Sequence, residues 1–167
     1  GRPGQWFGYA DEGIKPDIIT VAKGLGGGLP LGAMIALGRA ASLLIAGSHG
    51  TTFGGNPIAA SAAISVIEEI EKKNYRSLNL VKGALIRNLI SPIVGVGQVR
   101  GRGLLIGIVL KEPRAKEVAA ALLKSGFLVN ATNESVIRIA PAFTINESQI
   151  MKFVAAFNEA CEEVFHG

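Results

Sequence analysis

The stretch TVAKGLGGGLPLGA, residues 20–33, places one lysine directly after an apolar run and just ahead of a cluster of glycines. Residues 17–22, which are rich in β-branched side chains, predict a short buried strand, and residues 31–37 predict a second one. Lys23 therefore follows a predicted strand end, where loss of hydration disfavours a charged amine. A neutral amine can attack a carbonyl group, and glycines let a planar ligand approach the backbone. The alternative is a lysine whose ammonium group reaches water.

The spacing of these glycines excludes two familiar phosphate-binding loops. A Walker loop needs the lysine after the glycines and a serine or threonine after the lysine, which is not the order at Lys23. The spacing does not match the dinucleotide-binding fingerprint either. The glycines are thus interpreted as room around Lys23.

A polar loop, HGTTFGGNP at residues 49–57, carries two adjacent hydroxyls, Thr51 and Thr52. Pro57 suits the first position of a helix and Asn56 suits its cap. Hydroxyls and amides beside a helix start favour a phosphate group, although an ordinary capped loop has the same composition. His49 alone is a weak signal for catalysis.

Arg138 lies in the apolar segment SVIRIAP, residues 135–141. A guanidinium there needs an anion, which is either a structural carboxylate or a substrate carboxylate held by two hydrogen bonds. Arg100 and Arg102 alternate along a predicted strand, and we expect them to make structural ion pairs or to line a surface.

The composition limits the class of protein. The 167 residues are 49% hydrophobic, which allows a packed core. The net charge of +4 comes from scattered basic residues with no run of Lys and Arg among aromatics, which favours solvated surface charge over a nucleic-acid patch. No uninterrupted apolar run is long enough to span a membrane. The single cysteine excludes an internal disulfide and a cysteine metal cluster. One cysteine fits a reducing compartment. We predict a cytoplasmic protein, and we assign no metal-binding residue.

The pattern changes from a glycine-rich to a regular α+β character near residue 75, so a domain boundary is expected at residues 72–78. Periodicity and end signals predict a set of helices and a set of strands. The predicted helices are residues 38–47, 57–73, 75–90, 113–126 and 146–165. The predicted strands, beyond the first two, are residues 96–110 (two strands or one bent strand), 127–130 and 136–141. The helix from Pro57 is apolar on nearly every face, which predicts deep burial inside a larger protein or an oligomer.

Taken in order, KPDIITVAKGLGGGLPLGA, HGTTFGGNP, VRGRGLLIGIVL and VIRIAP resemble the class III aminotransferases over essentially the whole chain. Within that family the similarity is greatest to the acetylornithine aminotransferases of arginine biosynthesis. The resemblance implies an α/β fold, the C-terminal part of a fold type I pyridoxal-phosphate-dependent transferase. Residues 1–74 would be the end of the large, mainly parallel-sheet domain, and residues 75–167 the small C-terminal α+β domain.

The resemblance also implies residue roles. Lys23 matches the lysine that carries the cofactor pyridoxal 5′-phosphate and moves the proton. Thr52 matches the residue that binds the cofactor phosphate, typically in the partner subunit's site of a homodimer. Thr51 and Arg138 match positions that contact substrate, with Arg138 meeting a carboxylate. The implied reaction transfers the terminal amino group of N2-acetyl-L-ornithine to 2-oxoglutarate.

Members of this family are more than twice as long, and the chain starts at GRPG, so we expect a portion that is inactive by itself. Ornithine, succinylornithine and 4-aminobutyrate aminotransferases share most of these phrases and remain alternatives for the amino donor. A non-catalytic scaffold that kept the fold is the alternative from another class.

Overall fold

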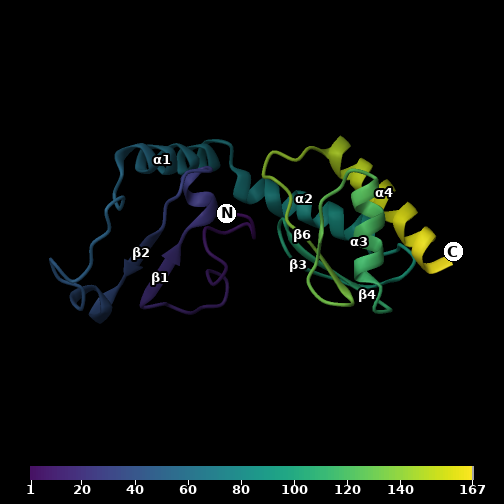
Figure 1. The fold of residues 1–167 in the computed structure, drawn as a ribbon, viewed down its shortest axis with the longest axis horizontal. Helices are drawn as coiled ribbons and strands as arrows, with labels where there is room; N and C mark the ends of the chain where they lie inside the picture. The colour runs from purple at the N-terminus through teal and green to yellow at the C-terminus, as the bar shows by residue number, and fades with distance from the viewer. Residues whose placement is uncertain (167) are drawn as a thin grey trace. The chain divides into compact units, whose positions relative to one another are not determined.

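The computed structural model describes residues 1–166, which form two compact units (Figure 1). The N-terminal unit is Tyr9–Asn74. The C-terminal unit is Gly1–Gly8 together with the chain from Tyr75 onward. The first eight residues thus pack with the second unit, which the sequence did not predict.

The N-terminal unit is built on a two-stranded antiparallel sheet of β1 (Ile18–Val21) and β2 (Ala33–Ala36). Two 3₁₀-helices, η1 (Lys23–Gly26) and η2 (Gly38–Ser42), follow the strands. The prediction that the first strand is buried was wrong, because its residues alternate between exposed and half-buried. The sheet has two strands, with η1 and α1 as the nearby layer, so neither face of the sheet is fully covered. The helix predicted at 38–47 was also wrong, since only the 3₁₀-helix forms.

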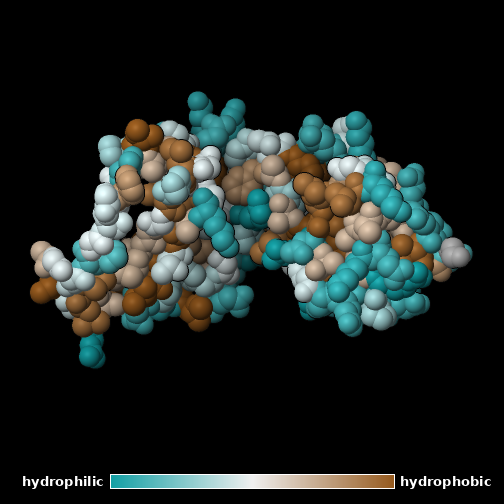
Figure 2. Space-filling view, in the orientation of Figure 1, coloured by the Kyte–Doolittle hydropathy of each residue, from teal (hydrophilic) through white to brown (hydrophobic). Residues whose placement is uncertain are grey.

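The helix α1 (Pro57–Lys72) confirms its predicted start. The side-chain oxygen of Asn56 accepts hydrogen bonds from the backbone N–H groups of Ile58 and Ala59, which satisfies two donors that a helix start leaves unpaired. Within this chain Ile58 is 72% and Ile64 56% exposed, so burial of the helix in a larger protein or an oligomer stays a prediction. Figure 2 shows apolar residues on the visible face of this unit, at the left.

The C-terminal unit holds a four-stranded antiparallel sheet with the order β3-β4-β6-β5. Its strands are β3 (Val96–Arg102), β4 (Leu105–Leu110), β5 (Asn130–Ala131) and β6 (Val136–Ile139). The segment 96–110 is therefore two strands. The strand predicted at 127–130 was wrong in extent, because only a two-residue pairing at 130–131 forms.

Three helices cover one face of this sheet: α2 (Tyr75–Ile90), α3 (Ala115–Lys124) and α4 (Glu147–His166). Alternate residues of the central strands, such as Ile106, Ile108 and Ile137, are buried beneath them. The start of α4 is held by a reciprocal pair, in which Asn146 and Gln149 each accept the other's backbone N–H with a side-chain oxygen. This cap confirms the predicted helix opened by Asn146.

The first residues of the chain lie along α2 and the β3–β4 turn. The Arg2 carbonyl accepts a hydrogen bond of 3.0 Å from the backbone N–H of Leu104. The amide of the fully buried Asn79 donates to the Gly1 carbonyl at 3.2 Å. The Trp6 ring lies 4.8 Å from the guanidinium carbon of Arg76. These contacts make Trp6, the single tryptophan, a reporter for this unit.

The helix α2 and the β3–β4 turn approach each other at backbone distance. A side chain at Gly83 would collide with the carbonyl group of Gly103, so the position requires glycine. Gly103 itself has φ of 52°, in the left-handed region that glycine tolerates best.

We expect Gly83→Ala to destabilise the C-terminal unit by about 2 kcal/mol, because overpacking outweighs the gain in helix propensity. Urea unfolding followed by Trp6 fluorescence measures this free energy. The matched control is Asn88→Ala on an exposed position of the same helix, which should change it by less than about 0.5 kcal/mol. An equal effect of the two variants would contradict the close contact.

Cys161 is fully buried in α4, and burial raises the pKa of its thiol to about 12. The folded-state pKa lies above the value of about 8.5 for a free cysteine. The stabilising effect of the buried thiol is therefore complete below pH 8.5 and is lost as the pH rises toward 12.

A thiol reagent such as dithiobisnitrobenzoate at pH 8 should react with Cys161 slowly in the native protein and rapidly in urea, because the thiolate is the reactive form. Absorbance of the released thiol gives both rates. The Cys161→Ala variant provides the blank. Rapid native labelling would show that the thiol is accessible.

Candidate active site

Lys23 stands at the end of β1, where η1 begins. It is preceded by Ala22 in an extended conformation and is itself left-handed, with φ of 54°. A non-glycine residue in this region carries a local conformational cost of about 1 kcal/mol or more. Such backbones gather at functional sites, so the strain at Lys23 supports the interest in its amine.

The Lys23 side chain is exposed, which corrects the expectation of a lysine that has lost its hydration. The reason is the half-exposed strand before it. A hollow of about 320 Å³ is lined by Thr20, Val21, Ala22 and Lys23. No carboxylate pairs with Lys23 among the residues that the structure describes. The amine therefore borders an open space and is available to a ligand.

The hydroxyl residues Thr51 and Thr52 lie in the exposed loop before α1. A turn closes there through a hydrogen bond of 3.3 Å from the Gly54 N–H to the Thr51 carbonyl. The next residue, Phe53, is 80% exposed. Within residues 1–166 neither threonine hydroxyl has a hydrogen-bond partner, so both remain free to bind a ligand.

The amides at the start of α1 offer less to an anion than the sequence suggested. The N–H groups of Ile58 and Ala59 are already taken by the Asn56 side chain. A phosphate at this loop would depend on the threonine hydroxyls and on the remaining loop amides.

The structure does not bring Lys23 and Thr52 together. The 3₁₀-helix η1 packs against α1 near Val66, where a side chain on Gly27 would come within 2.9 Å. Val66 lies about 13 Å along α1 from Pro57, at 1.5 Å per residue. Thr52 belongs to the loop that enters the opposite end of that helix, and the course of this loop can be followed in Figure 1. Within the N-terminal unit, η1 thus contacts α1 far along the helix from the end at which the loop of Thr52 enters.

Arg138 lies in β6 of the C-terminal unit, on the face of the sheet that the helices leave open. It pairs with Gly107 of β4 on one side and with Asn130 of β5 on the other. The side chain is exposed, and no carboxylate contacts it in the described part of the chain. Within residues 1–166 Arg138 therefore has no structural carboxylate as a partner.

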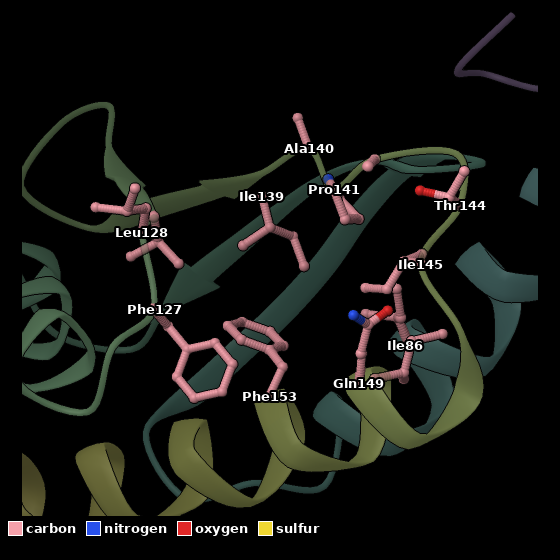
Figure 3. Close-up of a pocket in the computed structure, with 13 residues that line it drawn as sticks. Ile86, Phe127, Leu128, Ile139, Ala140, Pro141, Thr144, Ile145, Gln149 and Phe153 are labelled. Carbon is pink, nitrogen blue, oxygen red and sulfur yellow. The ribbon is translucent and has the colours of Figure 1, made fainter.

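A pocket that the sequence did not reveal lies in the C-terminal unit (Figure 3). Its volume is about 390 Å³. The rings of Phe127 and Phe153 meet edge to face at 5.6 Å beside Ile139. The Gln149 carboxamide is the main polar group, and its oxygen already serves the cap of α4. The lining is thus mostly apolar, with the Thr144 hydroxyl as a second polar group and no charged side chain.

Among residues 1–166 there is no cluster of three or more potential metal ligands. No helix in the same range has the length and apolar character needed to cross a bilayer.

Comparison with known proteins decides the family. The sequence profile described as aminotransferase class III matches residues 1–161. The chain belongs to the class III aminotransferases. It is 49% identical over 160 residues to acetylornithine aminotransferase of Mycobacterium leprae, covering 93% of this chain and 39% of that protein. It is 45% identical over 176 residues to the enzyme of the same name from Streptomyces coelicolor, covering 100% of this chain and 43% of that protein.

The fold agrees with this family. The crystal structure of acetylornithine aminotransferase from Elizabethkingia anophelis superposes with a TM-score of 0.85 at 30% identity, covering 97% of this chain and 43% of that one. The chain is thus a mixed α/β portion of the fold type I architecture. It spans about two fifths of the length of the curated relatives it matches.

Class III aminotransferases depend on pyridoxal 5′-phosphate. The residues present fit this cofactor. Lys23 offers an exposed amine without an acidic partner beside a hollow. Gly24, the residue after it, has no atom within 4 Å of the place where a side chain would start. A planar ring carrying an aldehyde therefore has access to the Lys23 amine.

Proposed function

We propose that the complete protein containing this chain is an aminotransferase that transfers the terminal amino group of N2-acetyl-L-ornithine to 2-oxoglutarate. The observation that carries the proposal is the 43–49% identity to relatives named acetylornithine aminotransferase. Those relatives are longer than this chain, so the activity is proposed for the complete protein and not for these 167 residues alone. Residues 9–74 would belong to the large cofactor-binding domain and residues 75–167, with residues 1–8 packed on them, to the small domain.

Lys23 is the proposed cofactor lysine and the proton carrier. Pyridoxal phosphate, when bound, supplies the aldehyde and the electron-withdrawing ring that amino-group transfer requires. The Lys23 Nζ would accept the proton from the substrate carbon and return it during the transfer. Its exposure beside a hollow and its left-handed backbone support this role.

Thr52 is proposed to bind the cofactor phosphate in the site of a second copy of the chain, and Thr51 to contact substrate there. The separation of Thr52 from Lys23 along α1 supports a site that two copies share. Arg138, exposed and without a carboxylate partner, is proposed to bind a substrate carboxylate through its planar fork of donors. A cytoplasmic homodimer acting on small molecules is the corresponding prediction for the whole protein.

The complete protein should use N2-acetyl-L-ornithine as amino donor with 2-oxoglutarate, and Lys23→Ala should abolish both turnover and the borohydride-reducible cofactor adduct. Glutamate formation measures turnover, and mass spectrometry after reduction locates the adduct. The matched control is Lys73→Ala, a lysine at the far end of α1, which should leave both unchanged.

A donor panel separates the alternatives. Preference for ornithine, succinylornithine or 4-aminobutyrate would replace the proposed substrate while keeping the reaction class. An adduct on a different side chain, or activity that survives Lys23→Ala, would support the non-catalytic scaffold or another mechanism.

The two threonines should differ in what they affect. Thr52→Ala should raise the dissociation constant of pyridoxal phosphate about tenfold or more, since a hydrogen bond to a charged group contributes about 1.5–3 kcal/mol. Thr51→Ala should leave the dissociation constant of the cofactor within about threefold and raise the Michaelis constant for a substrate. Fluorescence titration of the apoprotein and steady-state kinetics give the two constants. Identical profiles for both variants would refute the division of roles.

A further inference from the structure

One row of residues crosses the whole sheet of the C-terminal unit. The register pairs Arg100 of β3 with Gly107 of β4, Gly107 with Arg138 of β6, and Arg138 with Asn130 of β5. Directly opposed residues on neighbouring strands point to the same face. Arg100 and Arg138 are both exposed on the open face, whereas Ile106 next to Gly107 is buried on the helix-covered face.

The Arg100 side chain leans across β4 toward β6. Its Cγ and Nε atoms lie 3.5 and 3.6 Å from the place where a Gly107 side chain would begin. The Cγ1 atom of Val136, on β6, lies 3.8 Å from the same place. Arg100 therefore occupies the space above Gly107 and extends toward the strand that carries Arg138. Glycine at position 107 is what leaves this path open.

The open face carries positive charge without an acidic counterpart among its strand positions. Those positions are Gln98, Arg100, Arg102, Leu105, Gly107, Val109, Asn130, Val136 and Arg138. Arg100 forms no ion pair or side-chain hydrogen bond within residues 1–166, so the structural ion pair expected for it is not found there. The backbones of Arg100 and Arg138 are two strand spacings apart, about 10 Å. A doubly charged anion is the ligand that two such guanidiniums favour.

We infer that Arg100 is a specificity-determining residue, which acts with Arg138 across Gly107 to bind a dicarboxylate, and so favours a dicarboxylic 2-oxo acid as amino acceptor. The inference rests on the proposed function for its role in turnover. The binding itself follows from the row of residues on the sheet. A second cation adds less binding free energy for an amino donor with one carboxylate than for an acceptor with two carboxylates.

The binding experiment uses the complete protein with glutarate, an unreactive five-carbon dicarboxylate, and valerate, its monocarboxylate counterpart. Arg100→Gln should raise the dissociation constant of glutarate about tenfold or more and that of valerate less than about threefold, as measured by calorimetry. Arg100→Lys should recover part of the lost glutarate affinity, because lysine restores the positive charge without the planar guanidinium donors. Gly107→Val should also weaken glutarate binding although Arg100 is retained, because the valine side chain fills the space that the Arg100 side chain occupies.

The control is Lys124→Gln, which removes one positive charge from the end of α3, in the helix layer on the other side of the sheet. It should leave both dissociation constants unchanged. In kinetics, Arg100→Gln should raise the Michaelis constant for the acceptor 2-oxoglutarate by a similar factor. The kcat and the Michaelis constant for the amino donor should stay within about twofold.

The inference is overturned if Arg100→Gln weakens the binding of glutarate and valerate equally, or weakens the binding of neither. So does a loss in Arg100→Gln that Lys124→Gln reproduces, since that is an effect of net charge. An active wild-type enzyme with normal glutarate binding in Arg100→Gln refutes this inference alone. A wild-type protein that transaminates no donor refutes the proposed function, and the glutarate measurement still decides whether Arg100 and Arg138 form the anion site.

Discussion

Alternation of side chains along β4 and β6 is the constraint on which the C-terminal unit depends. Ile106 and Ile108 of β4, with Ile137 and Ile139 of β6, are buried beneath the helices. Because successive side chains point to opposite faces, burying these four forces Gly107 and Arg138 onto the open face. A slip of one residue would bury the guanidinium and expose the isoleucines, so the core fixes the register. The hydrophobic core thus presents Arg138 at the surface.

The two units differ in how completely they bury their apolar residues. In the C-terminal unit a single core joins the sheet to α2, α3 and α4. In the N-terminal unit large apolar side chains remain exposed on β1, β2, α1 and the loop between η2 and α1. Exposed apolar area of this extent is typical of surfaces that contact more protein. This agrees with a chain that spans about two fifths of its relatives' length.

End signals predicted the starts of two helices, and amphipathic periodicity predicted both bounds of a third, α2. Asn56 with Pro57, and Asn146, marked the starts of α1 and α4, because capping is a local interaction among a few neighbouring residues. The segment 38–47 had apolar residues of the right kind and no such cap, and only a 3₁₀-helix formed. The segment 127–130 resembled a strand by composition, but its pairing with β6 involves only the last of its residues.

The sequence by itself determined the family, through motifs around Lys23, Thr52 and Arg138 whose residue types and order are local properties of the chain. It also determined most helix boundaries, for the same reason. Only the tertiary structure decided that Arg100 reaches across Gly107 toward β6, that Thr52 and Lys23 lie apart along α1, and that residues 1–8 join the C-terminal unit. These facts depend on strand register and on packing between segments far apart in the chain, and no short window of sequence contains either.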